Sequence, residues 1–250
     1  MSVTKLSVNI NKVALLRNSR GRDYPNVLTF AEKCLAYGAH GITLHPRPDQ
    51  RHSRYSDVAD LRKLLRSHPG AELNVEGYPI PKFLKVVLEA LPHQCTLVPD
   101  DPKQLTSDHG WNLRSAGQGL RPIIRELTGR GIRVSLFVNA DSRNDIERAG
   151  EIGADRVELY TEPYARSYKT PGQSKVLASF RKGAACAQAV GLGVNAGHDL
   201  SLDNLGKFLE IPGILEVSIG HALIVECLEL GLKETIQSYL KILKRTSSSH

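Results

Sequence analysis

Apolar and polar positions alternate along this chain between two kinds of segment. Short runs of β-branched and apolar residues, typical of buried strands, occupy residues 6–10, 41–45, 72–77, 95–99, 133–138, 156–161, 192–197 and 216–221. Longer segments between them have helical apolar spacing, most clearly NVLTFAEKCLAYG, PKFLKVVLEAL, SRNDIERAGEIG and SKVLASFRKGAACAQAVG. The pattern therefore predicts strands that are separated by helices.

Residue types at the ends of the predicted helices support these limits. Side chains suited to capping a helix N-terminus are Asn26, Ser142 and Asp203. Glycines suited to ending a helix are Gly38, Gly153 and Gly191. The segment LKETIQSYLKILKR is predicted to be a last amphipathic helix that packs on the protein rather than on a membrane. Residues 244–250 are predicted to form a frayed tail.

The number of predicted strands indicates the fold. Eight strands with helices between them, over 250 residues, fit an α/β protein of the (β/α)8 or TIM-barrel type. A doubly wound sheet shows the same alternation and remains the alternative, although the strand number favours the barrel. No shift in composition divides the chain, so we expect one domain over residues 1–250.

Composition and charge narrow the class of protein. Apolar residues make up 41% and charged residues 24%, as in globular proteins. No apolar run is long enough for a membrane span, and the N-terminus has no secretory signal core. Four scattered cysteines without a C-x-x-C pair suggest a reduced, cytoplasmic protein. The net charge of +7 suits anionic partners. Few aromatic residues and no stacking stripe argue against nucleic acid as that partner.

Polar residues gather where the predicted strands end. His45 and Glu76 close two of the early strands, and His198 follows the seventh. Glu158 alternates with apolar neighbours, so it is expected to face the barrel interior. Because the carboxyl ends of barrel strands share one face, these side chains should meet there and suit acid–base chemistry. The alternative for each is structural, as a hydrogen-bonding histidine or a buried salt bridge.

Several features suit phosphate. V-N-A-G-H at 194–198 and S-I-G-H at 218–221 close the last two predicted strands, where barrels commonly hold phosphate. Arg17, Arg20 and Arg22 follow the first strand, although a solvated basic loop is equally consistent with them. The long polar stretch 100–118 is predicted to be a functional loop. The chain contains no H-x-H, H-E-x-x-H or C-x-x-C spacing, so the sequence does not predict a metal site.

Taken in order, several segments resemble the pyridoxine 5′-phosphate synthase family. They are VNINKVALLRNSRG, GITLHPRPDQRH, ELNVEG, CTLVPDDPKQLTSDHGW, VSLFVNAD, GADRVELYT, VNAGHDLS and SIGHALI. The resemblance covers most of residues 5–225 and implies a (β/α)8 barrel with extra helices, assembled as a homo-octamer. It implies condensation of 3-amino-2-oxopropyl phosphate with 1-deoxy-D-xylulose 5-phosphate to pyridoxine 5′-phosphate, phosphate and water. No cofactor or metal is implied.

The resemblance also implies residue roles. His45 and Glu76 are similar to proton acceptors, His198 to a proton donor, and Glu158 to a carboxylate that stabilises charged intermediates. The residues implied to bind the amino ketone phosphate are Asn9, Arg20, Asp199, Gly220 and His221. Those implied to bind the sugar phosphate are Asn11, Lys12, Arg47, His52 and Thr106. Residues 99–111 are implied to form a lid.

The chain departs from the family pattern at three places. Asn11 and Lys12 stand where many members have Asp-His, Asp199 where glycine is common, and Glu162-Pro163 where Gly-Cys is frequent. Two other functions stay open from the residues alone. One is a single-substrate phosphosugar isomerase or lyase, for which Lys12 at a strand end would suit Schiff-base chemistry. The other is a non-catalytic protein that binds a phosphorylated metabolite.

Overall fold

The strands of the computed structural model, which describes residues 3–100, 104 and 107–247, form a barrel. Within those residues eight parallel strands pair in chain order, and β1 pairs with β8 to close the ring. The strands are β1 (Lys5–Asn9), β2 (Gly41–Leu44), β3 (Glu72–Gly77), β4 (Gln94–Leu97), β5 (Arg133–Val138), β6 (Arg156–Tyr160), β7 (Gly193–Gly197) and β8 (Ile214–Ile219). The closed ring confirms the predicted (β/α)8 barrel and excludes the doubly wound sheet, whose edge strands stay unpaired.

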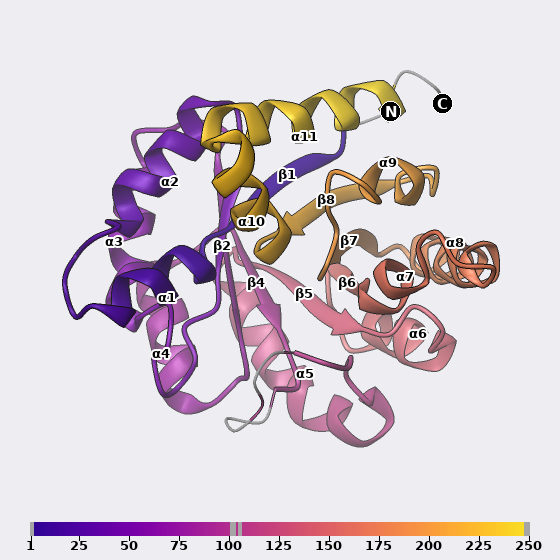
Figure 1. The fold of residues 1–250 in the computed structure, drawn as a ribbon. Helices are drawn as coiled ribbons and strands as arrows, with labels where there is room; N and C mark the ends of the chain where they lie inside the picture. The colour runs from indigo at the N-terminus through magenta and orange to yellow at the C-terminus, as the bar shows by residue number, and fades with distance from the viewer. Residues whose placement is uncertain (1–2, 101–103, 105–106, 248–250) are drawn as a thin grey trace.

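Helices surround the strands (Figure 1). They are α1 (Asn11–Ser19), α2 (Val27–Ala36), α3 (Tyr55–Leu65), α4 (Pro81–Ala90), α5 (Leu113–Gly129), α6 (Arg143–Glu151), α7 (Glu162–Ser167), α8 (Gln173–Ala189), α9 (Leu205–Phe208), α10 (His221–Leu230) and α11 (Leu232–Ser247). More than one helix follows β1, β6 and β8, which confirms that the barrel has extra helices. The last helix, α11, packs against α2, α9 and β1.

The predicted helix caps have different outcomes. The side chain of Asn26 caps α2 by accepting a hydrogen bond from the backbone N–H of Thr29 at 2.8 Å. Ser142 occupies the N-cap position of α6 but makes no capping bond, because its hydroxyl donates to Asp145 instead. The prediction for Asp203 is wrong: Asn204 is the N-cap of α9, and the Asp203 carboxylate pairs with the Lys169 ammonium at 2.7 Å.

The predicted helix ends are confirmed at the glycines. Gly38, Gly153 and Gly191 have φ angles of +104°, +92° and +81°, which a residue with a side chain rarely adopts. Within the tail predicted to be frayed, residues 244–247 belong to α11, and 248–250 lie outside the described residues. The helix continues because Tyr239 and Leu243 keep its inner face buried up to this point.

The inner and outer faces of the barrel differ in chemistry. Apolar strand residues such as Leu6, Val8 and Ile42 are fully buried between the strands and the helices. The alternate residues are polar and bond to one another inside the ring, as in Ser7 with Thr43 at 2.6 Å and Thr96 with Asn74 at 2.9 Å. Barrel interiors are usually filled by bulky aliphatic side chains. This interior instead offers hydrogen-bonding groups, and it can hold buried carboxylates.

Candidate active site

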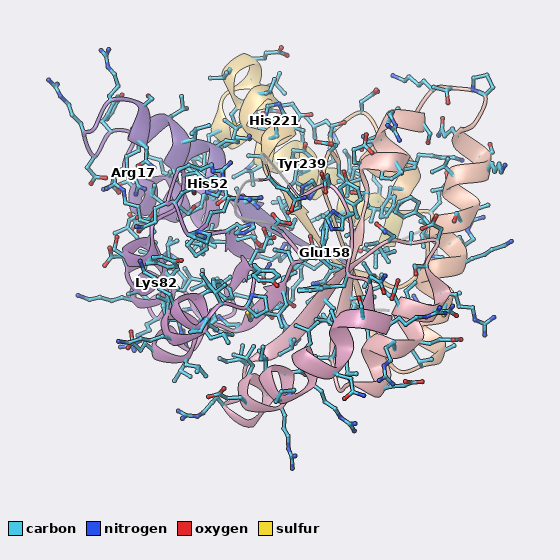
Figure 2. The ribbon with its side chains drawn as sticks, turned by 90° about the horizontal axis from the view of Figure 1, so that it is seen from below. Arg17, His52, Lys82, Glu158, His221 and Tyr239 are labelled. Atoms are coloured by element: carbon cyan, nitrogen blue, oxygen red, sulfur yellow. The ribbon has the colours of Figure 1, made fainter. Side chains whose placement is uncertain are left out.

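The carboxyl ends of the strands bring most of the predicted site residues together. Glu76 lies in β3 and Glu158 in β6, whereas His45 follows β2 and His198 follows β7. The charges of His52, His198 and Arg47 all act on His45, so these groups share one region. In Figure 2, which shows the molecule from below, Glu158 lies in the middle of the molecule, with helices on either side. Positions far apart in the sequence thus form a single cluster.

Two carboxyl groups in this cluster favour their protonated forms. Burial, followed by the charges of Asp100 and Glu216, raises the pKa of Glu76 to about 8. Burial, followed by the charges of Glu76 and Glu216, raises the pKa of Glu158 well above its ordinary value. Among the described residues, Oε2 of Glu158 has no hydrogen-bond partner. A cation brought beside these groups would therefore draw a proton out of them.

The glycines in the last two strand ends make room for the cluster. A Cβ atom on Gly197 would lie 2.3 Å from Oε1 of Glu158, so a side chain here would displace the Glu158 carboxyl group. A Cβ atom on Gly220 would lie 3.1 Å from Cβ of Asn9. The Asn9 amide in turn donates to Oε2 of Glu76 at 3.4 Å. The two glycines predicted to suit phosphate thus also allow close packing of the site's own side chains.

The three histidines of the cluster are shifted towards their neutral forms. Burial and then the charge of Arg47 lower the pKa of His45 well below its ordinary value and that of His52 to about 4. Burial also lowers the pKa of His198, whose ring lies 5.3 Å from the Tyr160 ring between centroids. Neutral imidazoles can accept protons, so this set can take part in proton transfer near neutral pH.

Asn11 connects the first two strand ends. Its side-chain oxygen accepts hydrogen bonds from the backbone N–H of His45 at 2.9 Å and from the Ser53 hydroxyl at 2.7 Å. These bonds leave the Asn11 amide group as a donor. The backbone N–H of Ser53 donates to Nδ1 of His52 at 2.9 Å, so neutral His52 carries its proton on Nε2. Both side chains are thereby set to donate towards an anion.

Arg47 is buried and paired, which the sequence does not reveal. Its guanidinium forms an ion pair with Asp100 and donates to the backbone oxygen of Gln104 at 3.1 Å. Asp100 also accepts from the Ser107 hydroxyl at 2.7 Å. Sequence reasoning missed Asp100 and Ser107 as site residues. The rule that identified Glu76 could have found Asp100, which follows β4 by three residues.

Other predicted residues lie at the edge of this cluster or outside it. Arg17 is a structural residue: its buried guanidinium forms two bonds to Asp57, at 2.6 and 3.0 Å. Arg20 and Arg22 are exposed beyond α1, a helix about 13 Å long that starts beside the site. The exposed members of the predicted set also include Lys12, Asp199 and His221.

Parts of two predictions fall outside the described residues. Thr106 is one of them, as are residues 101–103 and 105 of the expected lid. In the part of the chain that the structure describes, no three His, Cys, Asp or Glu residues are grouped so that they could hold a metal ion. No helix within the same residues combines the length and apolar character that crossing a membrane requires.

Comparison with known proteins identifies a family model that matches this chain and relatives that are similar to it in sequence. The family model described as "Pyridoxal phosphate biosynthesis protein PdxJ" matches residues 6–245. A Bacteroides thetaiotaomicron protein named pyridoxine 5′-phosphate synthase is 54% identical over 243 residues, covering 97% of this chain and 100% of the relative. A protein of the same name from Albidiferax ferrireducens is 51% identical over 251 residues, covering 98% and 99%.

Solved structures of more distant proteins share the fold. The 3-keto-L-gulonate-6-phosphate decarboxylase from Vibrio cholerae has a TM-score of 0.68 at 11% identity, covering 98% of this chain and 99% of its own. Phosphoribosylanthranilate isomerase from Thermotoga maritima has a TM-score of 0.56 at 14% identity, covering 96% and 98%. At such low identity the likeness concerns the barrel fold alone.

Proposed function

This chain belongs to the PdxJ family of pyridoxal phosphate biosynthesis proteins, and we propose on that premise that it is a pyridoxine 5′-phosphate synthase. It condenses 3-amino-2-oxopropyl phosphate with 1-deoxy-D-xylulose 5-phosphate to give pyridoxine 5′-phosphate, phosphate and water. The observation that carries the proposal is the buried cluster of two proton-holding carboxyl groups and three histidines shifted towards neutrality. The proposal requires no cofactor and no metal.

Each step of the reaction is accompanied by proton transfer, and the cluster suits such transfers. Joining an amine to a ketone and closing a ring needs imine formation, enolisation, eliminations and one carbon–carbon bond. His45 and Glu76 act as proton acceptors in these steps, and His198 acts as the proton donor. Glu158 stabilises cationic intermediates, because a positive charge beside this buried carboxyl group lowers its pKa and favours the carboxylate.

Substrate charge sets the protonation states of the acid and the base. The amino ketone brings an ammonium group, which favours loss of the proton from Glu76 and converts it into a base. The phosphate groups bring negative charge, which raises the low pKa of His198 and favours the protonated donor. The charges of the bound substrates therefore favour the deprotonated base and the protonated donor.

The polar residues that the family resemblance implies bind the two phosphorylated substrates; of these, Arg20 lies beyond α1 and Thr106 outside the described residues. Those for the amino ketone phosphate are Asn9, Arg20, Asp199, Gly220 and His221, with Asp199 contributing through its backbone. Those for the sugar phosphate are Asn11, Lys12, Arg47, His52 and Thr106. The Asn11 amide and the Nε2–H group of His52 are the donors that their other hydrogen bonds leave available.

The protein acts as a cytoplasmic homo-octamer in which each chain forms one domain over residues 1–250. Exposed apolar side chains on α1 and α10, two helices that contact each other, support self-association. They are Leu15, Leu16, Val225, Leu228 and Leu230. The partners of the chain are its two substrates and copies of itself, not nucleic acid or a membrane.

An assay with both substrates tests this function. Pyridoxine 5′-phosphate and inorganic phosphate are measured together for the wild-type chain and for Glu76→Gln and His198→Ala. We expect the wild type to form both products in equal amounts and each variant to lose at least ~10²-fold in turnover. Glu89→Gln, the same chemical change on the exposed face of α4, is the matched control and should keep full activity.

The outcomes separate the proposals. No product from the wild type with both substrates would contradict the synthase function. Turnover from the sugar phosphate alone would favour a single-substrate isomerase or lyase, and binding without turnover would favour a binding protein. Near-normal turnover by Glu76→Gln would contradict the role of that residue while leaving the function standing.

A further inference from the structure

The turn that carries His198 has a backbone conformation that residues with side chains rarely adopt. The φ angle is +88° at His198 and +57° at Asp199, so two successive residues lie in the left-handed region. Each costs free energy for an L-residue that is not glycine, and such a turn persists only where its surroundings hold it. The groups that hold this turn therefore control where the His198 imidazole lies.

Thr161 holds the first part of the turn. This residue is fully buried and follows directly after β6. Its backbone N–H donates to the carbonyl oxygen of Gly197 at 2.9 Å. Its hydroxyl lies 2.6 Å from the same oxygen and also bonds to the carbonyl oxygen of His198. Because the Gly197 oxygen already receives the N–H, the single hydroxyl proton is available to the His198 oxygen.

The position of Thr161 in the chain makes this use of its hydroxyl unusual. Thr161 is the N-cap residue of α7, where a threonine side chain normally accepts a hydrogen bond from a backbone N–H of its own helix. It makes no such bond here. The hydroxyl is directed across to the end of β7 instead. A role in helix capping therefore does not explain this side chain.

Asn204 holds the second part of the turn. Its amide donates to the carbonyl oxygen of Asp199 at 3.0 Å, and its side-chain oxygen accepts from the backbone N–H of Ser201 at 2.9 Å. The backbone oxygen of Asn204 accepts from the Tyr164 hydroxyl at 2.8 Å, which ties it to α7. Each carbonyl group from Gly197 to Asp199 is thus bonded to Thr161 or to Asn204.

We propose that Thr161 is a positioning residue for proton donation by His198. By bonding to the carbonyl groups of Gly197 and His198, it fixes the left-handed turn and directs the imidazole towards the substrate. The ring then rests against Tyr160 and Phe137, with centroid distances of 5.3 and 5.5 Å. The inference rests on the proposed function, in which His198 is the proton donor.

Three variants test the role of the hydroxyl. Thr161→Val removes it with little change in shape, and Thr161→Ser keeps it. Thr4→Val is the matched control, because the buried Thr4 hydroxyl also donates to a carbonyl group distant in sequence, that of Ile214 at 2.7 Å. This bond lies at the opposite ends of the strands, where β1 and β8 begin. We expect Thr161→Val to lower kcat by roughly 10- to 100-fold, since small misplacements of reacting groups have effects of this size. In Thr161→Val, KM for the sugar phosphate should stay within about threefold of wild type. In Thr161→Ser and Thr4→Val, kcat should also stay within about threefold of wild type.

A measurement that does not need turnover accompanies the kinetics. The pKa of His198 is followed by NMR in each variant, after assignment with His198→Ala. Burial lowers this pKa, so loosening the turn should raise it towards its ordinary value in Thr161→Val only. This readout also separates failure of the positioning role from failure of the proposed function.

The outcomes that overturn the inference are definite. They are wild-type kcat and an unshifted His198 pKa in Thr161→Val, or equal losses in Thr161→Val and Thr161→Ser. If Thr161→Val does not fold, Thr161→Ala decides, because it also removes the hydroxyl and leaves the Asn204 bonds in place. An unchanged His198 pKa and unchanged kcat in Thr161→Ala would then overturn the inference.

Discussion

Glu76 shows how its surroundings turn an ordinary carboxyl group into one that titrates near neutral pH. Its pKa is 4.5 without the fold and about 8 within it, mainly because of burial. The folded protein therefore binds this proton more tightly than the unfolded chain does. The stability that results is fully present below pH 4.5 and is lost as pH rises through about 8.

This linkage gives a prediction for stability. From pH 5 to pH 8 the wild type should lose free energy of unfolding relative to Glu76→Gln, by up to ~1.4 kcal/mol per pH unit. Urea unfolding of both proteins at several pH values measures the difference. Glu89→Gln, a change at an exposed carboxylate, should show no such trend relative to wild type. A constant difference between wild type and Glu76→Gln would contradict the raised pKa.

For single residues, the sequence predicts where a side chain lies in the fold better than it predicts which residues that side chain contacts. His45, Glu76 and His198 lie where the strand-end rule places them, because that rule depends only on where each strand ends. Arg17 was grouped with candidate phosphate ligands but pairs with Asp57, a residue 40 positions away. The role of the Thr161 hydroxyl depends likewise on a turn 36 positions away. Such contacts follow from the closed fold and not from local pattern.

Among the elements, helix α1 was not predicted from the sequence. The region after β1 read as a basic loop, but residues 11–19 form a helix. The apolar periodicity is weak because Leu15 and Leu16 are exposed rather than packed against the barrel. Helices α7 and α9, of 6 and 4 residues, were missed because they are too short to show a period. The strands were predicted because they are continuous buried runs, and α2, α4, α6, α8 and α11 because each buries one face. The prediction of a loop over 100–118 is wrong for residues 113–118, which begin the 17-residue helix α5.

The first residue of α1 provides a prediction for this element. Asn11→Ala removes the acceptor for the His45 N–H and the Ser53 hydroxyl, which should destabilise the protein by about 1–3 kcal/mol. It should also raise KM for the sugar phosphate. Asn26→Ala removes the cap of α2 and should cost about 1 kcal/mol without a change in KM. Thermal unfolding and steady-state kinetics of the pair distinguish them, and equal KM values would contradict a link from Asn11 to the substrate site.

At the scale of the whole molecule, the exposed apolar side chains on the outer surface give evidence about assembly. The barrel and its ring of helices bury most large apolar side chains, yet Leu16 on α1 and Leu228 on α10 remain 51% and 80% exposed. These helices contact each other, so the two residues belong to neighbouring elements. An apolar surface of this kind marks an interface in many proteins. The sequence alone did not predict its location, because exposure of an apolar residue becomes visible only in the folded chain.

The prediction for assembly follows from this surface. An octamer of 27.5 kDa chains has a mass of about 220 kDa. Leu16→Glu combined with Leu228→Glu places charges where apolar contact is expected, so light scattering after size exclusion should give a smaller mass. Val190→Glu, a change at an exposed apolar residue at the end of α8, should leave the mass unchanged. An octameric mass for the double variant would mean that the α1–α10 surface does not join the chains, and a smaller mass for Val190→Glu would direct the search for the interface to the end of α8.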